Sequence, residues 1–419
     1  MVGGVIVVVV VALISNIPSE TAATRDIFHQ NPIAKTLLST PPSLSPPHAS
    51  TKDNDVCKTL VEPHGYICQD YQVTTEDGYI LGMQRIPAGR SGKKANKPPV
   101  LIQHGIVSDA ALWLVSSPDQ CLPFIMADNG YDVWLSNARG TSSSRAHKSL
   151  SPNDAKFWDW TWVELAAYDL PAFVEGVHNQ TGQNLHYVGH SLGTLMALTA
   201  FSQDFKPINM LRSATLLSPI AYMNQIPSIL LKTITEFFLA EAGNLLGLHE
   251  FVPASKEVST ILGFVCNTPG IDCASLETAL TGPNCCIDKR TVERYIGHQL
   301  QSTSMKTLVH LSQMIRTGTI RKYDNVIINE NMKQYNQPTP PAYDLSKIPK
   351  DLPLFMSYGK NDYLSDVNDV KVLLDKIKDH DKDKLVVQFV DNYAHMDFVM
   401  ANNTKHVVFD RVTAFIALH

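Results

Sequence analysis

Ser191 stands in a sequence context that is typical of a reactive serine nucleophile. It is the middle residue of Gly189-His190-Ser191-Leu192-Gly193, between a predicted buried strand at 185–188 and a predicted helix at 192–201. A serine on such a sharp turn presents its hydroxyl clear of the sheet edge, beside the positive end of the helix dipole. The two glycines leave room for the turn, because a side chain at either position would collide there. The alternative is a glycine-rich turn that only leads into a packing helix.

The acid partner of such a nucleophile is expected at a later strand end, because the order along the chain in this kind of fold is serine, acid, histidine. Asp362 lies on the loop after the apolar run 354–356, where an acid partner is needed. Asp366 and Asp369 are instead expected in the first turn of a helix capped by Ser365, a common structural use of aspartate. We therefore assign Asp362 as the acid.

The base is expected to be His395, which directly follows a predicted strand at 385–390. Imidazole has an unperturbed pKa of about 6.5, so it can take the serine proton and return it to a leaving alcohol near neutral pH. Asp362 would then fix the tautomer of the ring and stabilise the imidazolium form. The other histidines of this region lie in a charged run or in the last amphipathic helix: His380, His406 and His419.

Two backbone N–H groups would stabilise the oxyanion that forms when the serine attacks a carbonyl group. One belongs to the residue after the nucleophile, Leu192, and the other is expected on the loop after the predicted strand 100–102. That loop contains His104-Gly105-Ile106, and the N–H of Ile106 is our candidate. His190, directly before the nucleophile, is expected to point away from the site and to have a structural role.

A mostly parallel sheet flanked by helices would bring these residues together. Residues 71–74 and 79–83 predict a hairpin around Asp77-Gly78, a pair that favours tight turns. Apolar runs separated by helical stretches then predict parallel strands, because such strands need crossover connections. These runs are residues 100–102, 132–135, 185–188, 214–217, 354–356 and 385–390. The fold class is therefore α/β, with a core formed by residues 56–219 and 346–419.

The interval 220–345 interrupts this pattern, because it shows helical periodicity and no clear strand. We interpret it as a mainly helical cap or lid domain inserted between two strands of the sheet. One apolar stripe in it falls on or near one face of a helix: Ile226, Ile229, Leu230, Ile234, Phe237, Phe238 and Leu245. The stripe either packs the cap onto the sheet or lines an acyl pocket and meets lipid when a lid lifts.

The N-terminal residues contain no predicted core element. The apolar run 5–14 is too short to span a bilayer and is typical of a signal-peptide core. Residues 1–23 are therefore interpreted as a signal peptide, with a short membrane anchor as the alternative. Residues 24–55, rich in proline and serine, are predicted to form a disordered linker. The chain is accordingly expected to be secreted, or delivered to a vacuole or lysosome.

Composition and charge exclude several other classes of function. The 419-residue chain has a formal net charge of −5, which provides no basic surface for nucleic acid. Glycine patterns for dinucleotide or phosphate binding are absent from the sequence, as are Cys-x-x-Cys pairs and a His-Glu-x-x-His helix. We therefore expect no cofactor, no metal and no stable protein partner.

The seven cysteines are consistent with an oxidising compartment. Cys57 and Cys68 bracket a short loop and should pair, whereas Cys121 lies in an apolar helical run and should be a buried free thiol. At least one further bridge is expected in a later cluster, most simply between Cys266 and Cys273. The cluster consists of Cys266, Cys273, Cys285 and Cys286. Two triplets are candidate glycosylation sites: Asn179-Gln180-Thr181 and Asn402-Asn403-Thr404.

A set of short motifs extends from about Val56 to the C-terminus. These are His64-Gly65-Tyr66, Thr74-Thr75-Glu76-Asp77-Gly78-Tyr79, Gln103-His104-Gly105, Asn137-Ala138-Arg139-Gly140, residues 164–172, residues 189–193, Asn361-Asp362 and His395-Met396-Asp397-Phe398. With them the sequence resembles the acid lipase family, which includes gastric and lysosomal lipases, and especially its plant triacylglycerol-lipase branch. Many animal members have glutamine after the nucleophile. Leu192 departs from this, but the donor is a backbone N–H and its role survives.

The resemblance implies an α/β-hydrolase fold, a catalytic triad of Ser191, Asp362 and His395, and oxyanion donors at Ile106 and Leu192. It also implies a serine ester hydrolase that cleaves acylglycerols through an acyl-enzyme, acting on lipid ester at a membrane or droplet surface. A steryl-ester or short-chain carboxylesterase is the alternative within the same chemistry. A non-catalytic lipid-binding protein on the same fold is the alternative from another class, because a fold does not fix a function.

Overall fold

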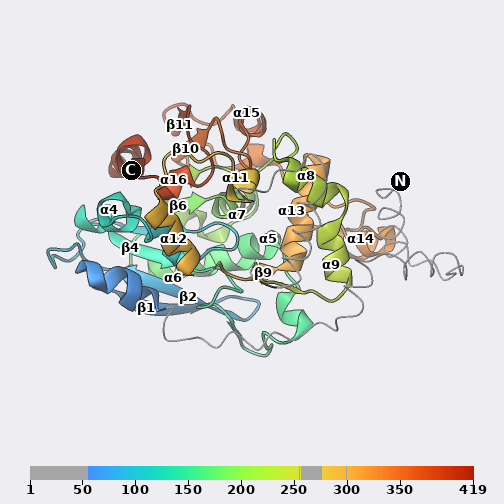
Figure 1. Cartoon of the computed structure of the whole chain (residues 1–419), viewed down its shortest axis with the longest axis horizontal. Coiled ribbons are helices and arrows are strands. Elements are labelled where there is room, and N and C mark those ends of the chain that lie inside the picture. The colour runs from blue at the N-terminus through green and yellow to red at the C-terminus, as the bar shows by residue number, and fades with distance from the viewer. Residues whose placement is uncertain (1–54, 254, 256–275, 299) are drawn as a thin grey trace, which may run out of the picture.

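The computed structural model describes residues 55–419 except 254, 256–275 and 299. Within these residues, nine strands form one sheet with helices on both faces (Figure 1). They are β1 Gln69–Thr74, β2 Tyr79–Ile86, β3 Pro99–Gln103, β4 Asp132–Ser136, β5 Ala146–His147, β6 Leu185–His190, β7 Leu211–Leu217, β10 Leu354–Gly359 and β11 Leu385–Val390. Their order is β1-β2-β4-β3-β6-β7-β10-β11, with β5 paired to β2.

Strands β4, β3, β6, β7, β10 and β11 run parallel to one another, whereas β2 pairs antiparallel with β1, β4 and β5. Every predicted strand is therefore confirmed, and so is the predicted hairpin, in which β1 pairs with β2. In a parallel sheet the carboxyl ends of all strands lie along one edge. The residues that follow β3, β6, β10 and β11 consequently meet at that edge.

Helices connect these strands and cover the sheet. They are η2 Cys57–Val61, η3 Glu62–His64, η4 Ala110–Trp113, η5 Pro118–Gln120, α4 Leu122–Asp128, η6 Ala155–Trp158, α5 Trp162–Glu164, η7 Leu165–Asp169, α6 Leu170–Thr181, α7 Leu192–Phe201, η8 Lys206–Met210, η9 Leu345–Lys347, α15 Val367–Lys376, α16 Asp397–Met400, η10 Lys405–Phe409 and α17 Asp410–Ala417.

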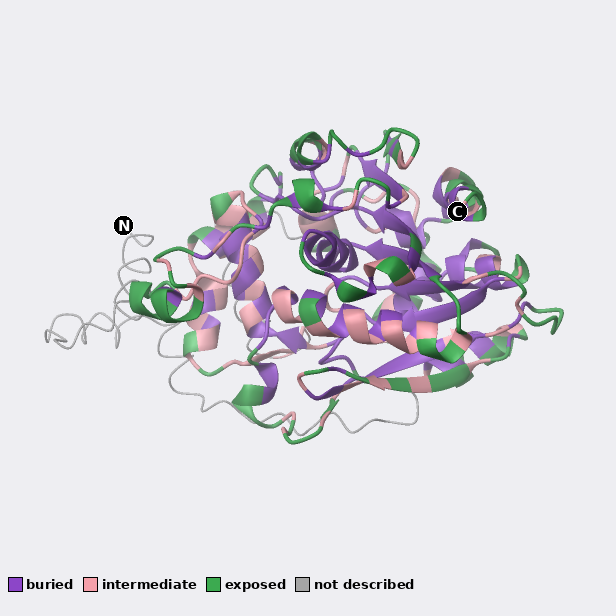
Figure 2. Cartoon of the chain, turned by 180° about the vertical axis from the view of Figure 1, so that it is seen from behind, coloured by how far each residue is buried: buried purple, intermediate pink, exposed green. Residues whose placement is uncertain are grey.

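The two faces of the sheet bury two separate apolar clusters, because successive strand residues point to opposite faces. In β4, Trp134 belongs to one cluster, whereas Val133 and Leu135 belong to the other. The first cluster includes residues of α5, α6 and α7, and the second includes residues of α4, η10 and α17. Helix α7, which follows the candidate nucleophile, is buried along its whole length (Figure 2). Strands covered on both faces explain the continuous apolar runs of the sequence.

The interval between β7 and β10 contains further helices and one short strand pair. They are α8 Ile229–Glu236, α9 Leu239–Leu245, β8 Glu250–Phe251, α11 Leu276–Thr281, α12 Lys289–Gly297, β9 Thr303–Ser304, α13 Met305–Thr317 and α14 Ile328–Tyr335. Helices α8, α9, α13 and α14 gather at one end of the molecule, beside the sheet (Figure 1). The β8–β9 pair differs from the sequence analysis, which predicted no clear strand here. Each strand of the pair is too short to show an alternating pattern.

The apolar stripe of this interval does not lie on one helix, so that prediction is wrong. The chain breaks between α8 and α9 at Phe238, whose φ of 52° cannot continue a right-handed helix. Within the stripe, Ile226 is fully buried in the cluster that includes residues of α7, whereas Ile229 is 60% exposed. The guanidinium of Arg316 lies 4.3 Å from the centre of the Phe238 ring. One part of the stripe therefore belongs to the core and another part faces outward.

The cysteine predictions are confirmed where the structure describes them. Cys57 pairs with Cys68, and Cys121 is a buried free thiol. Cys285 and Cys286 form a disulfide between adjacent residues. The predicted partners Cys266 and Cys273 lie outside the described residues, as do the expected signal peptide 1–23 and nearly all of the linker 24–55. In the part of the chain that the structure describes, no helix is long and apolar enough to cross a membrane.

Candidate active site

Ser191 lies on the sharp turn between β6 and α7, with φ of 55° and ψ of −120°. A non-glycine residue at positive φ is strained, and it persists only where its surroundings fix the backbone. The N–H of Ser191 donates to the carbonyl oxygen of Leu217 at 3.1 Å, and its own carbonyl accepts the N–H of Thr194 at 2.8 Å. A Cβ on Gly189 would lie 2.9 Å from the carbonyl carbon of Gly193. A Cβ on Gly193 would lie 2.9 Å from Cγ of Gln103 and 3.1 Å from the carbonyl oxygen of His104. Gly189 is therefore required by the close approach of Gly193 across the turn, and Gly193 by the close approach of the end of β3.

Asp362 and His395 follow the neighbouring strands β10 and β11, and their side chains meet. Nδ1 of His395 lies 3.0 Å from each carboxylate oxygen of Asp362, and both side chains are buried. The carboxylate also accepts the N–H groups of Leu364 at 2.9 Å and Ser365 at 2.8 Å. The backbone thus fixes the carboxylate, and the carboxylate in turn orients the ring.

The charge of this carboxylate is set by opposing effects. Burial raises the pKa of the Asp362 carboxyl, but the adjacent His395 ring and the two backbone donors outweigh burial and hold the pKa below its ordinary value. An ionised carboxylate at Nδ1 keeps the ring proton on that nitrogen and stabilises a positive charge on the ring. Nε2 is then free to accept a proton.

The neighbouring carboxylates of this loop have structural roles. Asp366 caps α15 by accepting the N–H of Asn368 at 2.8 Å, and Asp369 accepts the N–H of Gln225 at 3.0 Å. The prediction that Ser365 caps this helix is wrong. Its hydroxyl is buried and donates to the carbonyl oxygen of Pro219 at 2.8 Å, so it is not available to the helix N-terminus.

His190 connects the nucleophile turn to His395. Nε2 of His190 lies 3.0 Å from the carbonyl oxygen of His395, and the two ring centres are 4.8 Å apart. Burial lowers the pKa of His190 to about 3, so its ring is neutral near pH 7. The structural role predicted for His190 is confirmed, but the prediction that it points away from the site is wrong. Since His190 adjoins Ser191, this contact ties the backbone of His395 to the turn that carries the candidate nucleophile.

The second nitrogen of the candidate base has the environment of a proton acceptor. Nε2 of His395 is buried, and among the described residues it takes part in no hydrogen bond. A buried polar atom without a partner is uncommon in folded proteins and needs an explanation. A role as proton acceptor for a nearby hydroxyl would supply one.

The loop after β3 lies against the nucleophile. A Cβ on Gly105 would lie 3.0 Å from Cβ and 3.4 Å from Oγ of Ser191. This approach puts the peptide bond that carries the Ile106 N–H next to Ser191. Leu192 is the first residue of α7, and the N–H groups of a first helical turn have no acceptor within the helix. Both predicted oxyanion donors therefore border the serine.

His104 fixes the Gly105–Ile106 peptide, a role that the sequence analysis did not assign. Its Nδ1 lies 2.7 Å from the carbonyl oxygen of Gly105, and its Nε2 lies 3.0 Å from the N–H of Ala138. Because an N–H only donates, Nε2 is the acceptor and Nδ1 carries the ring proton. Burial lowers the pKa of His104 and thereby favours this neutral form. A peptide is planar, so the ring that holds the Gly105 carbonyl also orients the Ile106 N–H.

Arg139 anchors the loop that carries Ala138. Its buried guanidinium donates to Asp169 at 2.7 Å and to Asp77 at 2.7 Å, and its backbone N–H donates to Asp169 at 3.0 Å. Asp77 belongs to the turn between β1 and β2, and Asp169 ends η7. Three segments that are distant in the sequence are thus joined behind the loop that positions His104.

One group of side chains near the site has the spacing of metal ligands, with donor atoms of Cys285, Cys286 and Asp397 within 4.8 Å of one another. The two cysteines form a disulfide, so neither offers a thiolate. The carboxylate of Asp397 accepts backbone N–H groups of both cysteines. The donors fit a structural turn better than a metal site.

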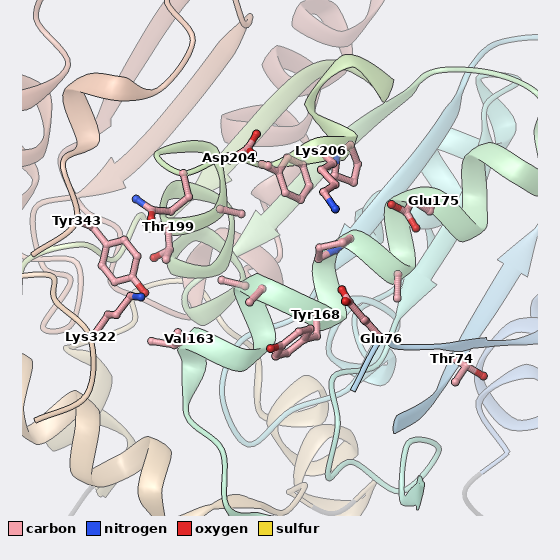
Figure 3. A pocket seen from close by; sticks show the side chains of 18 residues that line it. Thr74, Glu76, Val163, Tyr168, Glu175, Thr199, Asp204, Lys206, Lys322 and Tyr343 are labelled. Carbon is pink, nitrogen blue, oxygen red and sulfur yellow. The ribbon is translucent and has the colours of Figure 1, made fainter. Parts of the chain in front are cut away.

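The structure also contains a cavity of about 390 Å³ (Figure 3). Residues from the β1–β2 turn, η7, α6, α7, η8 and the loop between α7 and η8 line it, among them Glu76, Tyr168, Thr199, Asp204 and Lys206. None of the five predicted site residues is part of its lining. We therefore assign it no part in the chemistry at Ser191.

Sequence analysis also missed the contribution of residues 281–286. The carbonyl oxygen of Thr281 accepts the N–H of His395 at 3.2 Å. No spacing rule relates residues this far apart in the chain. The adjacent cysteines 285 and 286 were the one unusual feature of the segment.

Comparison with known proteins agrees with this description. Residues 98–399 match the family described as an alpha/beta hydrolase fold, and residues 57–117 match a partial alpha/beta-hydrolase lipase region. The chain is 46% identical to triacylglycerol lipase 2 of Arabidopsis thaliana, over 88% of this chain and 89% of that protein. It is 34% identical to gastric triacylglycerol lipase of Rattus norvegicus, over 84% of this chain and 89% of that protein.

Among solved structures, a soluble variant of monoglyceride lipase from Saccharomyces cerevisiae is similar, with a TM-score of 0.52 and 17% identity. The likeness covers 83% of this chain and 95% of that one, and it is a likeness of fold. The expected α/β-hydrolase architecture, a mostly parallel sheet flanked by helices, is confirmed.

Proposed function

The chain belongs to the acid lipase family of α/β-hydrolases, and we propose that it is a lipase that cleaves the carboxylic esters of acylglycerols, with Ser191 as its nucleophile. Relatives named triacylglycerol lipases, similar over most of both chains, support the substrate class. The arrangement of Ser191, Asp362 and His395 supports the chemistry.

Acylation begins when Oγ of Ser191 attacks the ester carbonyl carbon and Nε2 of His395 takes the hydroxyl proton. The carbonyl oxygen becomes an oxyanion, and the N–H groups of Ile106 and Leu192 stabilise its charge. When the tetrahedral intermediate collapses, the ester C–O bond breaks. The leaving alcohol, a diacylglycerol, takes the proton from Nε2.

Deacylation repeats these steps with water in place of the serine. Nε2 of His395 removes a proton from water, the hydroxide attacks the acyl-enzyme, and the fatty acid is released. The proton then returns to Oγ of Ser191 through the same nitrogen. The Asp362 carboxylate stabilises the imidazolium in both halves of the cycle.

The observation that carries the proposal is the environment of the His395 ring. One nitrogen is 3.0 Å from both oxygens of an ionised, buried carboxylate, and the other is buried without a hydrogen bond among the described residues. The peptide before Ile106 and the first N–H of α7 border the nucleophile that such a base would activate. A purely structural histidine has no need of this combination.

The lipid substrate and the compartment are also part of the proposal. We propose that the substrate is presented at a droplet or membrane surface. Long acyl chains are poorly soluble in water, so they move from a lipid aggregate directly into an apolar groove of the protein. We further propose that the chain is secreted or delivered to a vacuole or lysosome. The Cys57–Cys68 and Cys285–Cys286 disulfides support an oxidising compartment.

The test is hydrolysis by the purified chain of emulsified long-chain triacylglycerol, a steryl ester and a soluble short-chain ester, each at several pH values. We expect hydrolysis of the emulsified triacylglycerol. Activity confined to the steryl or short-chain ester would establish a different esterase of the same mechanism. Binding of lipid without hydrolysis of any ester would contradict the enzyme assignment.

A further inference from the structure

The loops that carry Asp362 and His395 are joined by a segment from elsewhere in the chain. Residues 281–286, here called the bridging segment, begin at the last residue of α11 in the interval between β7 and β10. The carbonyl oxygen of Thr281 accepts the N–H of His395 at 3.2 Å and the N–H of Tyr363, the neighbour of Asp362, at 3.3 Å. A single acceptor therefore connects the acid loop with the base loop.

The next residue of the segment fits between the two loops only because it lacks a side chain. Gly282 has a φ of +94°. A Cβ at this position would clash with the carbonyl oxygen of Asn361 and would lie 3.2 Å from Cβ of Ala394. Asn361 precedes the acid and Ala394 precedes the base. Any side chain at position 282 would consequently displace the backbone of the loops that carry Asp362 and His395.

The rest of the segment binds the chain on the far side of His395. Oδ1 of Asn284 accepts the N–H of Met396 at 3.0 Å. The N–H groups of Cys285 and Cys286 donate to the buried carboxylate of Asp397 at 3.0 and 3.1 Å. The same carboxylate accepts the N–H of Ala394 at 2.8 Å. These hydrogen bonds thus fix the chain around His395, from Ala394 to Asp397.

These contacts differ from those that only pack an insertion onto a sheet. They are hydrogen bonds to the backbone of His395 and its immediate neighbours, and the segment is further constrained by the Cys285–Cys286 disulfide. Catalysis depends steeply on such geometry, because misplacing a reacting group by about 1 Å can lower the rate about 10²-fold.

We propose that the bridging segment is a positioning element for catalysis, which sets the geometry of the Asp362–His395 pair through the backbone of both loops. This role rests on the proposed function, because it concerns the base of that reaction. The segment contacts no reacting atom. Its effect is to hold the base where it can both meet the carboxylate and receive the serine proton.

The decisive comparison is Gly282→Ala with Gly247→Ala. Gly247 lies in the same interval and has a φ of +88°, but a Cβ there would meet nothing within 4 Å. The two variants therefore share the cost of alanine at positive φ and differ in the contact with Asn361 and Ala394. Each variant and the wild-type chain are measured for kcat and KM on a soluble short-chain ester, for the pH dependence of kcat/KM, and for thermal unfolding.

We expect Gly282→Ala to lower kcat about 10²-fold with KM changed less than about threefold, while Gly247→Ala retains the wild-type kcat. The acid limb of kcat/KM reports protonation of the base in the free enzyme. It should move to lower pH in Gly282→Ala alone, because the displaced ring loses the stabilisation that Asp362 gives to its protonated form. Equal kcat values and pH profiles in the two alanine variants would overturn the inference.

If Gly282→Ala does not fold, Asn284→Ala decides the matter, since it removes the acceptor of the Met396 N–H without adding a side chain. A kcat lowered about tenfold, with unchanged KM and a shifted acid limb, supports positioning, and a wild-type profile overturns it. A wild-type chain that hydrolyses no ester would instead contradict the proposed function, and this inference with it. If the wild-type chain hydrolyses ester and the two glycine variants have the same kcat and pH profile, the proposed function is retained and only the positioning role of the bridging segment is contradicted.

Discussion

Nε2 of His190 lies 3.0 Å from the carbonyl oxygen of His395, so the residue before the candidate nucleophile holds the backbone of the candidate base. The ring is fully buried, and burial lowers its pKa to about 3. It therefore remains neutral and keeps a proton to donate from Nε2 at any pH near neutrality. Positions 190 and 395 are distant in the sequence, and this hydrogen bond brings the two parts of the site together.

His190→Phe should lower kcat about tenfold, because the carbonyl oxygen of His395 loses its donor and His395 is less firmly placed. His190→Gln is the matched control, since its side-chain amide can donate from a position close to that of Nε2. We expect the glutamine variant to stay within about threefold of the wild-type kcat. Equal losses in both variants would show that the hydrogen bond is not the reason for the effect. The measurement is kcat and KM on a soluble ester.

Asp169→Asn should lower the free energy of unfolding by about 3–5 kcal/mol, because it leaves the buried guanidinium of Arg139 with only one of its two carboxylate partners. Asp159→Asn is the control, since Asp159 pairs with Lys306 at an exposed position and should change stability by less than about 1 kcal/mol. Urea unfolding at pH 7 measures both variants. Similar losses in the two variants would contradict the role given to Arg139.

Stability should decrease as the pH falls below about 6.5. Burial lowers the pKa of His186, His190 and His310 to about 3 each, so the folded chain resists protonation of rings that the unfolded chain protonates readily. The unfolded state then binds more protons, and the free energy of unfolding falls by about 1.4 kcal/mol per pH unit for each histidine. Burial raises the pKa of Asp369 to about 6, which opposes this trend over a narrower range.

His310→Gln tests this dependence one ring at a time. Nε2 of His310 lies 2.9 Å from the carbonyl oxygen of Arg321, and a glutamine amide can make the same hydrogen bond. Urea unfolding at several pH values between 7 and 4 should give a shallower loss of stability for the variant, by about one proton. An unchanged dependence of the unfolding free energy on pH would mean that protonation of His310 does not differ between the folded and unfolded states.

The outward part of the apolar stripe should matter for lipid and not for folding. Ile229 is 60% exposed and Ile226 is buried. Ile229→Asp should lower hydrolysis of emulsified long-chain triacylglycerol several-fold more than hydrolysis of a soluble ester, because a charge weakens contact with a lipid surface. Ile226→Asp should instead lower both activities together with thermal stability. Val387→Asp, at an exposed position on β11, serves as the surface control. Equal effects of Ile229→Asp and Val387→Asp on emulsified substrate would contradict a lipid-facing role.

The sheet and the order of the site residues could be predicted because their signals are local. Strands buried on both faces appear as apolar runs, and Ser191 and Asp362 lie on the turn or loop after such a strand. His395 lies on the loop after β11, an apolar strand at the sheet edge with exposed residues. The glycines beside Ser191 indicated the turn because the close approach at 189 and 193 leaves no room for a side chain. At 189 the close approach is to Gly193, a neighbour in the sequence, whereas at 193 it is to Gln103 and His104 at the end of β3.

The rest depends on contacts between distant segments, which spacing does not encode. The bridging segment reaches His395 from a different part of the fold, and nothing in its sequence indicates that Gly282 will face Asn361. Ser365 is a good helix cap by residue type, but tertiary contact directs its hydroxyl to Pro219 and gives the cap to Asp366. Phe238 separates α8 from α9 in a left-handed conformation, although its residue type is compatible with a continuous helix.

The central claim is that Ser191 is the nucleophile, and labelling by an active-site-directed phosphonate ester tests it most directly. The wild-type chain and Ser191→Ala are incubated with the reagent, and intact mass and peptide mapping locate the adduct. We predict one adduct, on Ser191, in the wild-type chain and none in the variant, whose kcat should fall at least about 10⁴-fold while thermal unfolding is unchanged. An adduct on another residue, or ester hydrolysis retained by purified Ser191→Ala, would contradict the mechanism.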